Sequence, residues 1–392
     1  MDLKNDFDFR DIAPFEDNEF KQKMAALVKE PRFEAAVRYV MPDVDFPAFV
    51  EKLLQVPGKE YFQMVVMRPF VEELEKKTTR GITCGGAENL SPDKRYTFLS
   101  NHRDIVLDAA LLNLCLVRNG LRTCEIAIGD NLLIYEWITD LVKLNKSFIV
   151  KRNLRAMQAL NAARELSAYI HYAVNEKGES VWIAHREGRA KDSNDITQES
   201  LVKMLALWGE GTTAKRLCDI NPVPVSITYE YDPNDYLKAR EFLLRRENPA
   251  YKKTPEDDLR AMEIGILGFK GHVHYQIGRC INDGLEPMML SGDRNGVVKE
   301  ACGLIDRSIH SGYKIFPVNY IAYDLLEVTD MHHDKYSTAE FLQFREYVEG
   351  QLDKVDLPGL TAEQRGYMYR MILTMYANPL RNKLASLARD DK

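Results

Sequence analysis

The sequence predicts an α/β protein with a mixed, mainly parallel sheet flanked by helices and with helical extensions at both ends. Short runs of β-branched and aromatic residues alternate with helical patterns between about residues 95 and 280, which is typical of a mainly parallel sheet. Before and after this region, apolar residues recur at three- and four-residue spacing, as in amphipathic helices. The predicted division is a helical segment over 1–80, an α/β domain over 81–285 and a helical segment over 286–392.

The helical pattern of the first segment is clearest over 33–40, 49–54 and 61–77. Prolines separate these runs, and Pro69 should end or kink the third one. The boundary with the α/β domain is predicted over 81–92, where Gly85-Gly86 and Ser91-Pro92 are turn signals.

The strands of the α/β domain are predicted from short runs rich in valine, isoleucine, threonine and aromatic residues, over 96–100, 148–150, 180–184 and 223–229. Helices are expected between them, notably over 154–175 and 196–208. A further strand over 271–276 is expected at the edge of the sheet. Beyond residue 285 the pattern is helical to the end of the chain.

Composition and charge exclude several classes of protein. The chain has 392 residues, 45% of them hydrophobic and 29% charged, with a net charge of −6. These values are ordinary for a globular protein with a full core, and the acidic balance argues against nucleic-acid binding. The six cysteines are scattered without a Cys-x-x-Cys pair, which indicates free thiols in a reducing compartment.

The apolar stretches are too short to cross a membrane. Those over 105–117 and 132–142 are interrupted by polar and acidic residues, whereas a spanning helix needs about 20 mainly apolar residues. The first 18 residues lack the apolar core of a secretory signal. We therefore expect a cytoplasmic protein that meets a membrane at most from its surface.

The first candidate for catalysis is His102, which follows the predicted strand 96–100. We expect a helix to start just after it, leaving the imidazole exposed and able to act as a general base near neutral pH. Either Asp104 or Asp108 could orient the ring by accepting its other N–H. In the alternative interpretation, His102 and Asp104 only cap the helix.

Basic residues gather around the second and third predicted strands, at Lys143, Lys146, Lys151, Arg152, Arg155, Arg186, Arg189 and Lys191. The carboxyl ends of parallel strands share one edge of a sheet, where ligands of open α/β folds bind. We therefore expect these groups near His102, where they could hold a phosphate. The alternative is a solvated charged face.

Glu187 and Gly188 precede Arg189 directly. The backbone N–H of Gly188 could donate to an oxyanion, and Glu187 could bind an acceptor hydroxyl or position Arg189. An ordinary turn between a strand and a helix is the alternative. Trp182, like the leucines at 107, 111 and 112, is interpreted as core. The histidines show no complete set of metal ligands, so no metal site is expected.

Four blocks of the sequence resemble, in order, the motifs of the glycerolipid acyltransferase superfamily, which includes glycerol-3-phosphate and lysophosphatidate acyltransferases. The blocks contain His102 with Asp108, then 129–133 with 147–153, then the Glu187-Gly188-Arg189 block, and finally 223–230. Five residues separate His102 from Asp108, one more than in the family, and Arg189 follows Gly188 without the family's intervening residue. The resemblance covers about residues 80 to 285.

The resemblance implies a glycerol-3-phosphate acyltransferase-like fold and a role in lipid metabolism and phospholipid biosynthesis. An acyl group would move from acyl-CoA or acyl carrier protein to a hydroxyl of glycerol-3-phosphate or lysophosphatidate. His102 would be the base, Asp108 or Asp104 would orient it, and Lys151, Arg152 and Arg189 would hold the phosphate. No cofactor, metal or nucleic acid is implied, and a lipid product implies peripheral contact with the inner face of the membrane. The altered spacings leave two alternatives: another lyso-lipid acceptor, for example an amino-acid-derived one, or an inactive lipid-binding scaffold.

Overall fold

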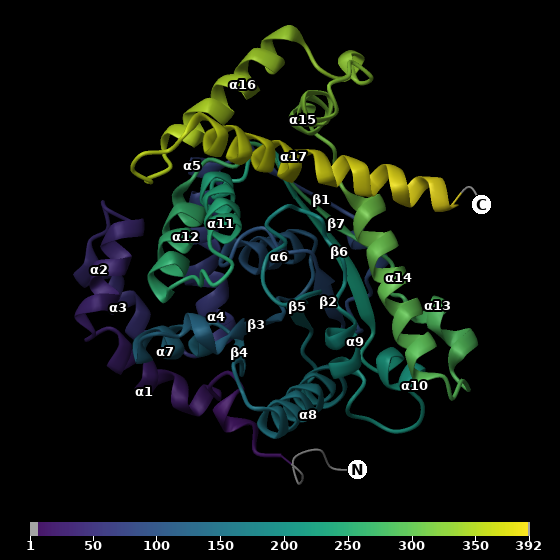
Figure 1. The fold of residues 1–392 in the computed structure, drawn as a ribbon. Coiled ribbons are helices and arrows are strands. Elements are labelled where there is room, and N and C mark those ends of the chain that lie inside the picture. The colour runs from purple at the N-terminus through teal and green to yellow at the C-terminus, as the bar shows by residue number, and fades with distance from the viewer. Residues whose placement is uncertain (1–6, 391–392) are drawn as a thin grey trace.

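A computed structural model describes residues 7–390, and its centre is a seven-stranded sheet in the order β1-β7-β6-β2-β5-β3-β4 (Figure 1). Only β6 and β7 pair antiparallel, and the other five pairs are parallel. The strands are β1 (Ile82–Gly85), β2 (Thr97–Ser100), β3 (Glu125–Gly129), β4 (Ser147–Val150), β5 (Val181–Ala184), β6 (Pro222–Tyr229) and β7 (Val273–Ile277). The predicted fold class is confirmed.

Two features of the sheet differ from the sequence prediction. The strand predicted at the edge, β7, lies between β1 and β6, so that β1 and β4 form the edges. The outer strand β1 was hidden because it falls between Gly81 and Gly86, in a stretch that reads as turns. The second missed strand, β3, contains Glu125, a residue depleted in strands, whose carboxylate is buried and paired with Lys177.

The N-terminal helices form a layer with a core of its own. They are α1 (Asp17–Leu27), α2 (Pro31–Val40), α3 (Phe46–Leu54), α4 (Lys59–Phe62) and α5 (Arg68–Thr78). A π-helical turn, η3 (Gln63–Met67), joins the last two directly before Pro69, where the sequence predicts a break or kink. Phenylalanines of α1 to α4 pack with α7 (Glu136–Leu144), which brings this layer against the end of the sheet near β4.

Helices cover both faces of the sheet. On one face, β2, β4 and β5 pack against α8 (Ala156–Tyr172), α9 (Glu199–Leu205), α10 (Thr213–Cys218) and α14 (Arg294–Gly312). On the other face lie α5 and α6 (Leu107–Arg118). The predicted helix over 154–175 corresponds to α8 and the π-helical turn η6 (Ala173–Lys177) that extends it.

The last helices of the chain gather at one end of the molecule, where α17 (Ala362–Asp390) runs across it (Figure 1). It packs on α11 (Asp235–Glu247), α15 (Pro317–Glu327) and α16 (Thr338–Asp353). Two further helices are α12 (Pro255–Leu267) and α13 (Asn282–Leu285). In residues 7–390 no helix has the length and apolar character needed to cross a membrane. The division at residues 80 and 285 stays a prediction.

Candidate active site

His102 lies in a loop that leaves the carboxyl end of β2. The helix that follows begins at Leu107, so the expectation of a helix directly after His102 was wrong. The side chain of Asn101 fixes the start of this loop, because its amide accepts from the backbone N–H of Ile227 on β6 (2.8 Å) and donates to the Ile227 carbonyl (2.9 Å). The imidazole is thereby held at the edge where β2, β3, β4 and β5 all end.

Asp108 is the carboxylate that contacts His102. Its Oδ2 lies 2.8 Å from His102 Nδ1 and also accepts from the backbone N–H groups of Arg103 (2.6 Å) and Asp104 (3.0 Å). Its Oδ1 accepts from the hydroxyl of Tyr229 (3.0 Å). Since Oδ2 of Asp108 accepts from two backbone N–H groups, it accepts from His102 as well, and Nδ1 of the imidazole carries the proton. The other ring nitrogen, Nε2, is then the one that can act as a base.

Asp104 has a different task. Its Oδ1 accepts from the backbone N–H groups of Val106 (2.9 Å) and Leu107 (2.8 Å), so it caps the start of α6. Burial, and then the charge of Asp108, raise the pKa of the Asp104 carboxyl. The capping interpretation therefore holds for Asp104 but not for His102.

A buried ion pair that was not predicted from the sequence also holds the loop that carries His102. Arg103 donates to Asp195 (2.6 Å between Nη2 and Oδ2), and both side chains are almost completely buried. Tyr313 on the segment after α14 donates to the same carboxylate. Asp195 is far from His102 in the sequence and belongs to no motif with it. Only the fold places its carboxylate next to Arg103.

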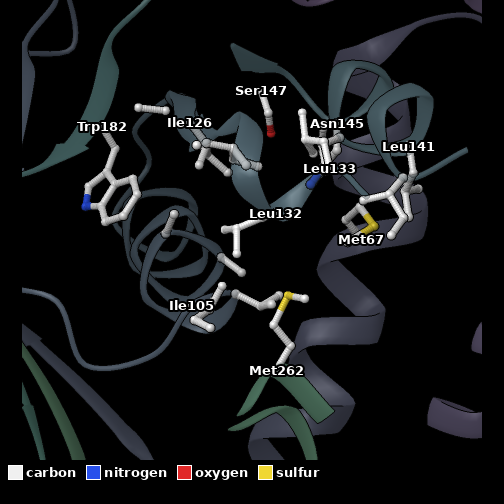
Figure 2. A pocket seen from close by; sticks show the side chains of 18 of the residues that line it. Met67, Ile105, Ile126, Leu132, Leu133, Leu141, Asn145, Ser147, Trp182 and Met262 are labelled. Carbon is white, nitrogen blue, oxygen red and sulfur yellow. The ribbon is translucent and has the colours of Figure 1, made fainter. Parts of the chain in front are cut away.

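A cavity of about 1170 Å³ opens beside His102 and runs among the N-terminal helices. This volume is larger than that of most small-molecule sites, which are usually about 300–1000 Å³. Its wall is mostly apolar, with side chains from α2, α3, α5, α7 and the sheet. Figure 2 shows part of it, including Ile126 on β3, Leu141 on α7 and Met262 on α12. Trp182, interpreted as core, also lines this cavity: its ring meets the His102 ring edge-on (5.8 Å between centroids). The leucines of α6 are core, as expected.

Three of the basic side chains that line the cavity follow the carboxyl ends of β4 and β5, whereas Lys52 on α3 and Lys77 on α5 line it among the N-terminal helices. Lys151 pairs with Glu165 (3.1 Å), and Arg152 lies 3.4 Å from Glu187. Arg186 differs from both, because its Nε is buried without a partner among residues 7–390. Sequence reasoning counted Arg186 among the basic residues but placed the phosphate on its neighbours.

The other basic residues are not part of the cavity wall. Arg189 is absent from it, although one of its buried guanidinium nitrogens has no partner. Lys143 donates to the carbonyls of residues 10 and 11. Lys146 pairs with Glu179 (2.9 Å) at the amino ends of β4 and β5, opposite the ends that carry His102. Lys191 pairs with Glu241. The expectation that all these groups meet near His102 was wrong. Lys143 and Lys146 precede β4 in the sequence and therefore do not lie at its carboxyl end.

Glu187 and Gly188 both line the cavity, in the turn after β5. The backbone N–H of Glu187 donates to the Gln198 side chain (2.7 Å). Gly188 has φ of +67°, a left-handed conformation that favours glycine. The nearby His185 is buried, and burial lowers its pKa to about 4, so its imidazole is neutral at neutral pH.

The geometry suits proton transfer beside an apolar chain and an anion. An imidazole oriented by Asp108, a mostly apolar cavity and a guanidinium whose buried Nε has no partner among the described residues lie within one space. Within residues 7–390 there is no group of three or more His, Cys, Asp or Glu side chains that could hold a metal ion.

Comparison with known proteins gives two findings. A family model described as Acyltransferase matches residues 81–228. A crystal structure of the 1-acyl-sn-glycerophosphate (LPA) acyltransferase from Thermotoga maritima is similar at 14% identity and a TM-score of 0.35, over 71% of this chain and 97% of that one. No curated protein sequence matches the chain.

Proposed function

We propose, from the premise that residues 81–228 belong to the acyltransferase family, that this chain transfers a fatty acyl group from a thioester to a hydroxyl of a phosphate-bearing glycerol acceptor. The observation that carries the proposal is the His102–Asp108 pair at the wall of a large apolar cavity, beside the unpaired guanidinium of Arg186. Acyl-CoA or acyl carrier protein would be the donor, and glycerol-3-phosphate or lysophosphatidate the acceptor.

In the proposed reaction, His102 Nε2 takes the proton of the acceptor hydroxyl while its oxygen attacks the thioester carbonyl. Asp108 stabilises the imidazolium that forms and keeps the ring oriented. The tetrahedral intermediate then collapses, the C–S bond breaks, and the imidazolium returns the proton to the leaving thiolate. The products are an ester and a free thiol, and no acyl-enzyme is needed.

The apolar wall would bind the acyl chain. Each buried methylene contributes about 0.8 kcal/mol, so a long chain is held firmly and its carbonyl is fixed beside His102. The acceptor phosphate would lie at the carboxyl edge of the sheet, against Arg186, Arg152 and Lys151. Arg186 is the strongest candidate, since the two others already face carboxylates. Arg189 does not line the cavity, so it would act on the phosphate from outside it.

We also propose that the cavity opens toward a lipid surface. Val106 and Leu154 line the cavity and are more than a third exposed, and the next turns of α8 carry Met157 (72% exposed) and Leu160 (49% exposed). The exposed Arg155 lies beside them. Apolar side chains flanked by basic ones favour peripheral binding to anionic lipids.

The test is release of free thiol from palmitoyl-CoA or palmitoyl carrier protein, with each acceptor present or omitted. We expect release that requires an acceptor and falls roughly 10²- to 10⁴-fold in His102→Ala, the value of a positioned base. His333→Ala, at an exposed histidine near α16, is the matched control. Unchanged release in His102→Ala would refute the proposal, whereas release only with another lyso-lipid would change the acceptor. No release with any pair would favour a lipid-binding scaffold.

A further inference from the structure

The cavity that contains His102 has a polar patch at the start of β4, formed by Asn145 and Ser147 and separate from the charged groups at the carboxyl ends of the strands. Both side chains line the cavity, and Figure 2 shows them beside Leu133, Ile126 and Met67. Neither has a task in the acyl transfer proposed above.

The patch lies far from the reacting atoms. Ser147 pairs with Ile126, and Ile126 pairs with Trp182, so these three side chains form one row across β4, β3 and β5. Two strand spacings, about 10 Å, therefore separate Ser147 from Trp182, which is the residue that touches His102. An acyl chain with its carbonyl at His102 would reach the patch only with its middle or distal carbons.

The patch contains a polar atom without a partner within the described residues. Oδ1 of Asn145 is buried without a hydrogen bond, and Ser147, which is 1% exposed, lines the cavity next to it. Buried polar atoms without partners cost free energy, typically about 1–3 kcal/mol each. Next to an apolar ligand that cost would persist, so the patch needs a ligand that can form hydrogen bonds.

The turn that carries these residues is rigidly held. Lys146 stands between them in a left-handed conformation, with φ of 58°, and its buried ammonium group pairs with Glu179 (2.9 Å). The side chain of Gln63 donates to the carbonyl of Asn145 (3.4 Å). The two polar groups are thus fixed in place before any ligand arrives, which favours specific recognition.

We propose that this patch binds a hydroxyl group on the middle or distal part of the acyl chain, so that hydroxylated acyl thioesters are the preferred donors. The proposal rests on the proposed function and names its donor class. A hydroxyl both donates and accepts, which matches the amide of Asn145 and the hydroxyl of Ser147. A site built to pair with a substrate hydroxyl disfavours the analogue that lacks it, because its own polar groups are then left unpaired.

The decisive experiment compares three donors: stearoyl-CoA, and hydroxystearoyl-CoA with the hydroxyl on the third or on the twelfth carbon. We expect kcat/KM at least tenfold higher for the twelfth-carbon compound than for stearoyl-CoA, and no gain for the third-carbon compound. Asn145→Leu and Ser147→Ala should each reduce the preference by roughly threefold to tenfold, the usual effect of one hydrogen bond. Ile128→Val, at an apolar position of the same wall, should leave it unchanged.

Binding separates this proposal from the proposed function. Trp137 and Trp182 both line the cavity, so their fluorescence reports the binding of free fatty acids without any turnover. If no donor is turned over but hydroxystearate, with its hydroxyl on the twelfth carbon, binds at least tenfold more tightly than stearate, the acyltransferase is refuted and the hydroxyl site stands. Equal binding of the two acids by the wild type, or an unchanged preference in Asn145→Leu, overturns the hydroxyl site.

Discussion

Replacing Asp108 by asparagine separates the charge of this residue from its hydrogen bonds. The carboxylate accepts four hydrogen bonds, from His102, from the backbone N–H groups of Arg103 and Asp104, and from Tyr229. The amide oxygen of an asparagine can take the place of Oδ2 and keep three of them. Its NH2 group would then face the Tyr229 hydroxyl, which can turn to accept.

The expected magnitude follows from this geometry. A hydrogen bond to a charged group is worth about 1.5–3 kcal/mol and one between neutral groups about 0.5–1.5 kcal/mol, so the imidazolium loses roughly 1–2 kcal/mol of stabilisation. We therefore expect kcat to fall about fivefold to thirtyfold. KM for both substrates should stay the same, because Asp108 is completely buried and does not line the cavity.

The assay is steady-state thiol release, with thermal unfolding of each variant as the check on folding. Tyr229→Phe is the matched control, because it removes a hydrogen bond to Asp108 without touching His102. We expect it to lower stability by about 1 kcal/mol and kcat by less than threefold. A folded Asp108→Asn protein with kcat within twofold of wild type would refute the pairing of Asp108 with a basic His102.

Three further predictions test other parts of the molecule. A Cβ at Gly129 would lie 2.5 Å from Oδ1 of Asn131 and 2.7 Å from Nε of Arg152, so Gly129→Ala should displace both side chains and raise KM for the acceptor about threefold to tenfold; a changed KM for the donor alone would contradict this. Burial raises the pKa of Asp235 to about 7, above about 4 in an unfolded chain, so its contribution to stability is full below about pH 4 and declines up to about pH 7. Asp235→Asn should flatten the decline of the urea-unfolding free energy over that range, and parallel curves would refute the assignment. Met157→Asp should weaken binding to anionic vesicles at least tenfold in flotation, while Leu342→Asp, at an exposed leucine of α16, should not; equal losses would exclude α8 as the contact.

The sequence was most informative where a residue's neighbours are local. The strands β2, β4, β5 and β6 follow from runs of valine, isoleucine and aromatic residues, and His102 follows from its place after one of them. The contact between His102 and Asp108 was one of two alternatives, because the start of α6 decides it. The helix starts at Leu107 because the side chain of Asp104 caps it there, and this cap could not be deduced from the spacing of residues in the sequence.

Long-range partners could not be predicted in this way. Arg103 reaches Asp195, and Lys146 reaches Glu179, only because the sheet places distant segments side by side. Lys146 was expected near His102 because it is close to Lys151 in sequence. One strand, β4, lies between the two residues and carries them to opposite edges.

The origin of the cavity walls has a consequence for how this protein could change. The strand ends supply the imidazole and the guanidinium groups, whereas α1 to α3 and α5, which contribute no strand, supply much of the apolar lining. Substitutions in those helices can therefore reshape the space for the fatty chain while the proton-transfer pair stays in register with the sheet. The space for the acyl chain and the proposed proton transfer therefore depend on separate parts of the chain, and each can change without the other, while the proposed hydroxyl site stays with the sheet.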